Sequence, residues 1–160
     1  MTDRLPLQAG LDAMALVEAA AVTLIGVARQ RGLDGTLDVG EDAATVLRAA
    51  QCQDEQHYHA LRAAGAAEVS DGFTIPATVV SDRALLMITF LELKAAGIAG
   101  YMALTREWAA RGALSQVEIT YAIGSVEAQH LTLAHALVDF NWQIPANLAW
   151  FLLLLAAGTV

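Results

Sequence analysis

Six ionisable residues stand where the surrounding sequence is apolar, and their types suit metal chemistry. Four of them form two acid-x-x-His pairs, Asp54 with His57 and Glu127 with His130. On a helix, residues three apart lie on one face, a turn apart, so each pair can present a carboxylate and an imidazole to the same ion. Carboxylate and imidazole together are typical ligands of iron and related divalent metals.

The other two residues of this set are Glu18 and Lys94. Glu18 lies one helical turn from Met14 and Val22 on the same face. Lys94 lies one turn from Phe90 in the same way. Burying a charge is costly unless it is paired or bound to a metal. We therefore expect all six side chains to face inward and to meet in one central polar cluster.

Helical periodicity covers most of the chain and must position these residues. It predicts long helices at about 8–31, 41–64, 82–110 and 115–140, and a short helix from about 146. Ser81 or Asp82 has the side chain of an N-cap for the third helix. Ser115 with Glu118 has the spacing of a capping box for the fourth. Pro145 is expected to separate the short last helix from the fourth.

The connections between these helices differ in length. The one between the second and third helices contains Gly72 and Pro76 and is the longest, whereas glycines at 65 and 112 end the second and third helices. Short connections favour antiparallel neighbours, and one long central connection is the ferritin-like arrangement. We therefore expect one all-α domain over residues 1–160, an antiparallel four-helix bundle of the ferritin-like type with a short C-terminal helix.

Composition limits the classes of partner. The net charge of −8 argues against nucleic-acid binding, which needs lysine and arginine against phosphate. Cys52 is the only cysteine, so no disulfide forms within the chain. The most apolar stretch, 148–157, is shorter than the ~20 residues of a membrane span, and no signal-peptide pattern precedes the first helix. We expect a cytoplasmic protein without a membrane span, which forms a homodimer or larger homo-oligomer through 148–157.

Several short motifs carry a resemblance to a known family. They are Glu18, "DEQHYHALRAAGA" from Asp54, "FTIP" from Phe73, "GIAGY" from Gly97 and "VEAQH" from Val126. With these motifs the chain resembles bacterial ferritin-like domain proteins, of the superfamily of ferritins and bacterioferritins, over nearly its whole length. The resemblance implies a bundle that is often dimeric. In metal-bearing members it implies a di-iron carboxylate centre that reacts with oxygen or peroxide.

On this resemblance the metal ligands would be Glu18, Asp54, His57, Glu127 and His130. An enzyme of this kind would be a ferroxidase-like oxidoreductase with a role in iron handling or oxidative stress. The motifs do not identify catalytic residues beyond these ligands.

Two positions depart from the family pattern. Asp54 stands where a longer glutamate is usual, and Lys94 stands where the third helix should supply a glutamate. A protonated lysine cannot bind a metal, and with neutral histidines the cluster would carry a charge of about −2. One divalent ion balances that charge and two do not. Three states stay open: a di-iron centre, a site for one ion of iron or another divalent metal, and a metal-free core in which Lys94 pairs with Glu18 or Glu127. The third state would suit a structural or binding protein.

Overall fold

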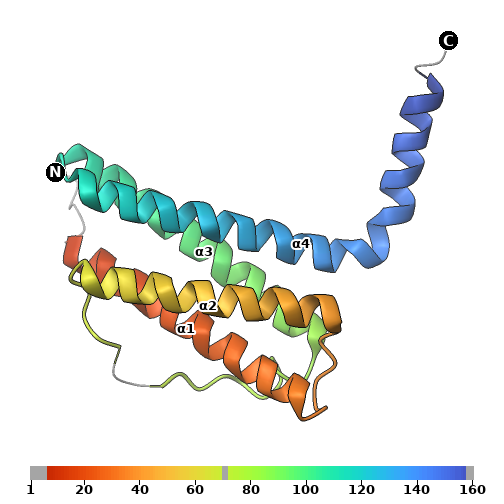
Figure 1. Ribbon diagram of the computed structural model, residues 1–160, viewed down its shortest axis with the longest axis horizontal. Helices are drawn as coiled ribbons and strands as arrows, with labels where there is room; N and C mark the ends of the chain where they lie inside the picture. Colours follow the sequence, from red (N-terminus) through yellow and green to blue (C-terminus); the bar gives the residue numbers. More distant parts are fainter. Residues whose placement is uncertain (1–6, 70–71, 158–160) are drawn as a thin grey trace.

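The computed structural model describes residues 7–69 and 72–157, with side chains described through residue 136. In this part of the chain there are four helices and no strand. They are α1 (Leu7–Leu33), α2 (Glu41–Ala63), α3 (Arg83–Ala110) and α4 (Leu114–Ala157) (Figure 1). The helices pack as a four-helix bundle, which confirms the expected all-α fold class.

The long connection decides which helices are neighbours. Helix α1 packs against α2 and α3, and α4 packs against α3 and α2. Figure 1 shows α1 and α4 running in one direction and α2 and α3 in the other, so every packed pair is antiparallel. The connection after α2 runs back along the bundle and is tied to α1, where the Ala67 N–H donates to Asp12 Oδ1 at 2.7 Å. In a plain up-down bundle α2 and α4 would lie diagonally opposite each other. Here α2 and α4, which carry the two acid-x-x-His pairs, are neighbours.

The helix ends follow most of the local signals. Asp82 caps α3, because its Oδ1 accepts a hydrogen bond from the Leu85 N–H at 3.0 Å. Gly65 and Gly112 follow α2 and α3 with φ of +106° and +71°, a conformation that glycine adopts without strain. The capping-box interpretation of Ser115 is wrong, since α4 already begins at Leu114.

The expected break at Pro145 is also absent. Helix α4 continues to Ala157 as one element, so there is no separate C-terminal helix. Figure 1 shows α4 bending in its C-terminal part and leaving the bundle. A proline inside a helix removes one hydrogen bond and favours such a bend without ending the helix. The side chains of 148–157 lie outside those described, so their role in self-association stays a prediction.

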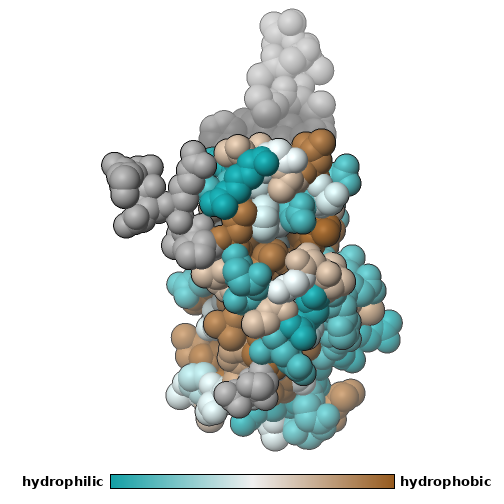
Figure 2. All heavy atoms as spheres, turned by 90° about the vertical axis from the view of Figure 1, so that its left-hand side faces the viewer, coloured by the Kyte–Doolittle hydropathy of each residue, from teal (hydrophilic) through white to brown (hydrophobic). Residues whose placement is uncertain are grey.

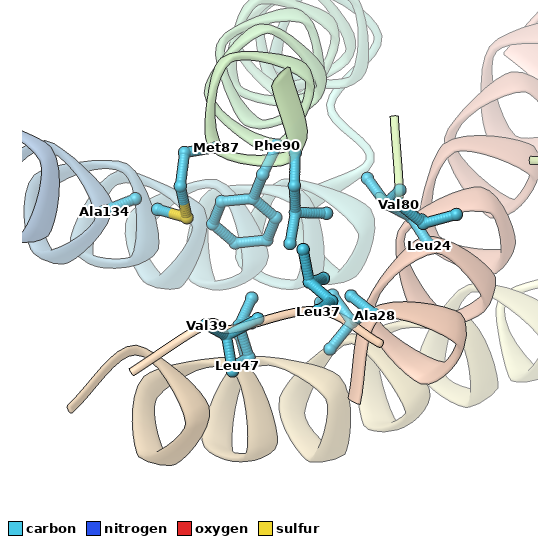
Figure 3. Packing of buried hydrophobic residues seen from close by; sticks show 12 residues of the cluster. Leu24, Ala28, Leu37, Val39, Leu47, Val80, Met87, Phe90 and Ala134 are labelled. Atoms are coloured by element: carbon cyan, nitrogen blue, oxygen red, sulfur yellow. The ribbon is translucent and has the colours of Figure 1, made fainter. Parts of the chain in front are cut away.

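Two apolar clusters fill the bundle, one toward each end. The first gathers around Phe90 and Met87 of α3, which Figure 3 shows beside residues of the other helices. Its fully buried members include Leu24, Ile25, Ala28, Leu47, Ala50, Leu86 and Ala134. The second contains Leu11, Met14, Ala15, Leu61, Tyr101, Leu104, Trp108 and Ile123. Along every helix the polar cluster predicted above lies between members of these two groups, so apolar packing closes it at both ends.

Apolar residues also reach the surface. Leu33, Leu114 and Tyr121 are the most exposed of the large apolar side chains described, at 80%, 69% and 69%. Figure 2 shows apolar and polar residues intermixed over the end of the bundle that faces the viewer.

Two helices, α1 and α3, are long and apolar enough to cross a membrane by length and composition alone. Core helices of soluble bundles share this property, and both helices contribute to both apolar clusters. The expectation that the chain has no membrane span stays a prediction.

The N-cap of α3 gives a first prediction. Asp82→Ala should lower the free energy of unfolding by about 1 kcal/mol, because the Leu85 N–H loses its acceptor. Ser81→Ala, at the neighbouring exposed position, is the control and should change it by less than ~0.5 kcal/mol. Urea denaturation followed by circular dichroism measures both. Equal losses in the two variants would contradict the assignment of Asp82 as the cap.

Candidate metal centre

The structure brings all six predicted residues into one buried cluster at the centre of the bundle. Helix α1 supplies Glu18, α2 Asp54 and His57, α3 Lys94, and α4 Glu127 and His130. None of the six residues is more than 8% exposed. The position of each residue on its helix directs its side chain into the bundle. The antiparallel packing of the helices then places the six side chains at the same height along the bundle axis.

Lys94 is the central cation of this cluster. Its Nζ lies 2.7 Å from both carboxylate oxygens of Asp54 and 2.7 Å from Glu127 Oε2. The Phe90 ring lies beside it, with its centroid 5.4 Å from Nζ. The expected pairing with Glu127 is therefore present. Glu18, the other expected partner, is replaced by Asp54, which Lys94 reaches across the diagonal of the bundle.

Glu18 is held by a different residue. The Tyr101 hydroxyl donates to Glu18 Oε1 at 2.5 Å. Burial, reinforced by the charge of Glu18, raises the pKa of the Tyr101 phenol, so the phenol stays a donor. Glu18 Oε2 is buried without a hydrogen bond and lies 3.6 Å from His57 Nδ1. Tyr101 thus leaves one carboxylate oxygen directed at the imidazole.

His57 lies among the carboxylates of three helices. Its Nδ1 is 3.1 Å from Glu127 Oε1 and 3.9 Å from Asp54 Oδ1, and these are ion-pair contacts, not hydrogen bonds. Burial opposes a charge on His57. The adjacent Glu127 and Glu18 carboxylates outweigh burial and raise the pKa of the imidazole to about 9. In the absence of metal, His57 therefore carries a positive charge at neutral pH.

The two carboxylates that contact Lys94 titrate in opposite directions. Burial, together with the charges of Glu127 and Glu18, raises the pKa of Asp54 to about 8 against the opposing effect of Lys94. Burial also disfavours the Glu127 carboxylate, but the adjacent His57 and Lys94 outweigh it and hold the pKa of Glu127 well below its usual range. The cluster thus keeps one carboxyl proton near neutral pH. With that proton, Lys94 and protonated His57, its charges balance without a metal.

Four buried atoms in the cluster nevertheless make no hydrogen bond. They are Glu18 Oε2, His57 Nδ1, Glu127 Oε1 and His130 Nδ1. Their closest separations are 3.1, 3.4 and 3.6 Å. An ion with bonds of ~2.0–2.2 Å holds its ligand atoms about 3.0–3.5 Å apart in octahedral or tetrahedral geometry. The three pairs of atoms that lie this close therefore have the spacing of ligands around one ion.

One group of ligand atoms in the cluster is close enough together to hold a metal ion. One ligand atom from each of Glu18, Asp54, His57 and Glu127 lies within 4.8 Å of the others, and both oxygens of Asp54 also contact Lys94. His130 Nδ1 borders this group, 3.5 Å from Asp54 Oδ1. The Lys94 ammonium contacts both oxygens of Asp54 and Oε2 of Glu127, and it therefore competes with any cation for these oxygens.

One neighbour of the cluster has no signal in the sequence. Gln53 is exposed on α2, and its Oε1 is in hydrogen-bond contact with His130 Nε2. The residue precedes Asp54 and belongs to the solvent-facing side by helical phase. Only the packing of α2 on α4 brings it to the histidine.

Comparison with models of known protein families, with curated proteins and with solved structures found no match. The case for a function therefore rests on the geometry of this cluster.

The cluster predicts how the stability of the metal-free protein depends on pH. His57 binds its proton more tightly in the folded state, with a pKa of about 9 against 6.5, so its contribution is complete below pH 6.5 and is lost as the pH rises through 9. Asp54 acts in the same direction, and its contribution is lost through about pH 8. Chelator-treated protein should therefore become less stable between pH 6.5 and 9.

The matched variants are His57→Gln and His59→Gln, since both histidines lie on α2 and His59 is exposed. Urea denaturation across this pH range should show a shallower decline for His57→Gln and an unchanged decline for His59→Gln. If both variants keep the full decline, the charge on His57 does not stabilise the fold.

Proposed function

We propose that this chain is a ferritin-like protein whose central cluster binds one divalent metal ion, iron or a related metal, in place of a two-metal centre. The observation that carries the proposal is the set of four buried donor atoms without hydrogen bonds, which face one another from α1, α2 and α4. Buried polar atoms are nearly always paired, so a group of four indicates a missing partner. The ligands would be Glu18, Asp54, His57 and Glu127, with His130 as the fifth.

Charge supports a single ion. With neutral histidines, three carboxylates and one ammonium are balanced by one divalent cation, whereas two cations would leave an uncompensated buried charge, which is strongly unfavourable. Binding must then release the His57 proton and the proton kept by the carboxylates. We therefore infer that Lys94 takes the electrostatic place of the second ion.

The residues around the site would shape its chemistry. A ferrous ion there would supply electrons to oxygen or peroxide, which would suit a cytoplasmic role in iron handling or oxidative stress. Tyr101 fixes the orientation of Glu18, and Lys94 fixes Asp54 and Glu127. The two apolar clusters limit the access of water from both ends of the bundle.

One observation favours a second candidate function. The three contacts of Lys94 with Asp54 and Glu127, together with the protons bound near neutral pH, already balance the cluster. In this alternative the chain is a metal-free structural or binding protein that uses the ion pairs only for stability.

Metal stoichiometry separates the two candidates. Protein purified without added metal and titrated anaerobically with Fe²⁺ or Mn²⁺ should bind one ion per chain. Lys94→Glu should raise this toward two, because the substitution replaces the internal cation with a further carboxylate. Without metal the same variant should melt at a lower temperature, since four carboxylates then repel one another, and metal should restore the melting temperature.

Arg106→Glu is the matched control, because it makes the same change of charge at an exposed position of α3. It should leave the stoichiometry at one. A parent protein that binds no ion in calorimetry, with Lys94→Glu equally inert, would reject the metal site and leave the structural alternative.

We also propose that the chain forms a homodimer or larger homo-oligomer through the apolar residues 148–157. In multi-angle light scattering the full chain should have at least twice the 16.9 kDa mass of one chain. A chain ending at Pro145 should have the mass of a monomer, because it lacks that apolar surface. A monomeric full chain would contradict the proposal.

A further inference from the structure

His130 is held from outside the cluster by Gln53. The His130 Nε2 atom and Gln53 Oε1 are in hydrogen-bond contact between α4 and α2. With the amide oxygen facing the ring, as it does here, Nε2 is the donor and carries the proton. A neutral imidazole with its proton on Nε2 has its lone pair on Nδ1.

The other nitrogen of the same ring faces the cluster. His130 Nδ1 lies 3.4 Å from Glu127 Oε1 and 3.5 Å from Asp54 Oδ1, and it is buried without a hydrogen bond. A lone pair at this position can bind a cation. A proton there would instead face two oxygen atoms. The contact with Gln53 therefore selects between two chemically different sites.

The equivalent contact cannot form for the other histidine. The sequences DEQH from Asp54 and EAQH from Glu127 have the same acid-x-x-His spacing, so Gln53 before the first corresponds to Val126 before the second. Valine has no acceptor atom. The two histidines of the site are therefore unequal, although both follow an acid by three residues.

We propose that Gln53 is a positioning residue that fixes His130 in the Nε2–H tautomer, so that His130 presents a ready Nδ1 ligand while His57 does not. Fixing the ring nitrogen opposite the metal is a common way to orient a histidine ligand, and its loss typically weakens metal binding 10–100-fold. The expected effect of Gln53 on metal affinity rests on the proposed function. The tautomer itself does not.

The first experiment uses the metal-free protein. Long-range ¹H–¹⁵N correlation spectra report which ring nitrogen of a histidine is protonated, and the His130 signals are assigned as those missing in His130→Gln. At a pH where the ring is neutral, His130 should show protonated Nε2 and unprotonated Nδ1. Gln53→Leu should shift both ¹⁵N signals toward those of a mixture of tautomers. Because Gln53 is exposed, this variant should fold as the parent does.

Two further variants test the cause. Gln53→Glu keeps an acceptor and should retain the parent pattern. Gln56→Leu, which changes an exposed glutamine one turn away on α2, should also retain it. A parent ring with its proton on Nδ1, or unchanged His130 signals in Gln53→Leu, would overturn the assignment of Gln53.

The second experiment measures Mn²⁺ affinity by calorimetry. Gln53→Leu should bind about tenfold more weakly than the parent, and Gln53→Glu and Gln56→Leu should stay within about threefold of it. Equal affinity of Gln53→Leu and the parent would overturn the positioning role. If the parent binds no Mn²⁺ while the spectra show the expected tautomer, the proposed metal site fails and the assignment of Gln53 stands.

Discussion

The ion pairs of Lys94 are the constraint on which the centre of this bundle depends. The ammonium is almost completely buried and touches carboxylates from α2 and α4, so a single side chain of α3 connects three helices. A buried charge without its partner is destabilising by several kcal/mol, on the order of 3–5. The helices are thereby constrained to a register in which Asp54 and Glu127 meet Lys94. A sliding of α3 by one turn would separate the Lys94 ammonium from both carboxyl groups and leave it buried without a partner.

The order of the helices makes this arrangement possible. Because the connection after α2 runs the length of the bundle, α2 and α4 become neighbours and their acid-x-x-His pairs face each other. The two apolar clusters on either side then exclude water from the charges. The same exclusion strengthens the pairing with Lys94 and makes an unpaired donor atom costly. Stability and any metal chemistry therefore depend on the same packing.

The result is a cluster with two different sides. On one side the Lys94 ammonium contacts both oxygens of Asp54 and the Oε2 atom of Glu127. On the other, Glu18 and the two histidines present donor atoms that nothing in the described residues satisfies. Glu127 belongs to both sides, since Oε2 contacts the ammonium and Oε1 faces the imidazoles. A cation entering the second side would therefore change the electrostatics of the first through one shared carboxylate.

Local periodicity in the sequence was sufficient to predict the four helices and the inward direction of all six cluster residues, while the choice between Ser81 and Asp82 as the N-cap of α3 needed the structure. These features depend on spacings of three and four residues, which a helix converts directly into a shared face. It was not sufficient to predict which acid Lys94 contacts, because a long side chain selects among nearby carboxylates only after the helices have packed. The contact of Gln53 with His130 could not be predicted, and the expected end of the fourth helix at Pro145 was wrong. Gln53 reaches the histidine across an interface between helices far apart in the sequence, and a proline bends or ends a helix according to what surrounds it.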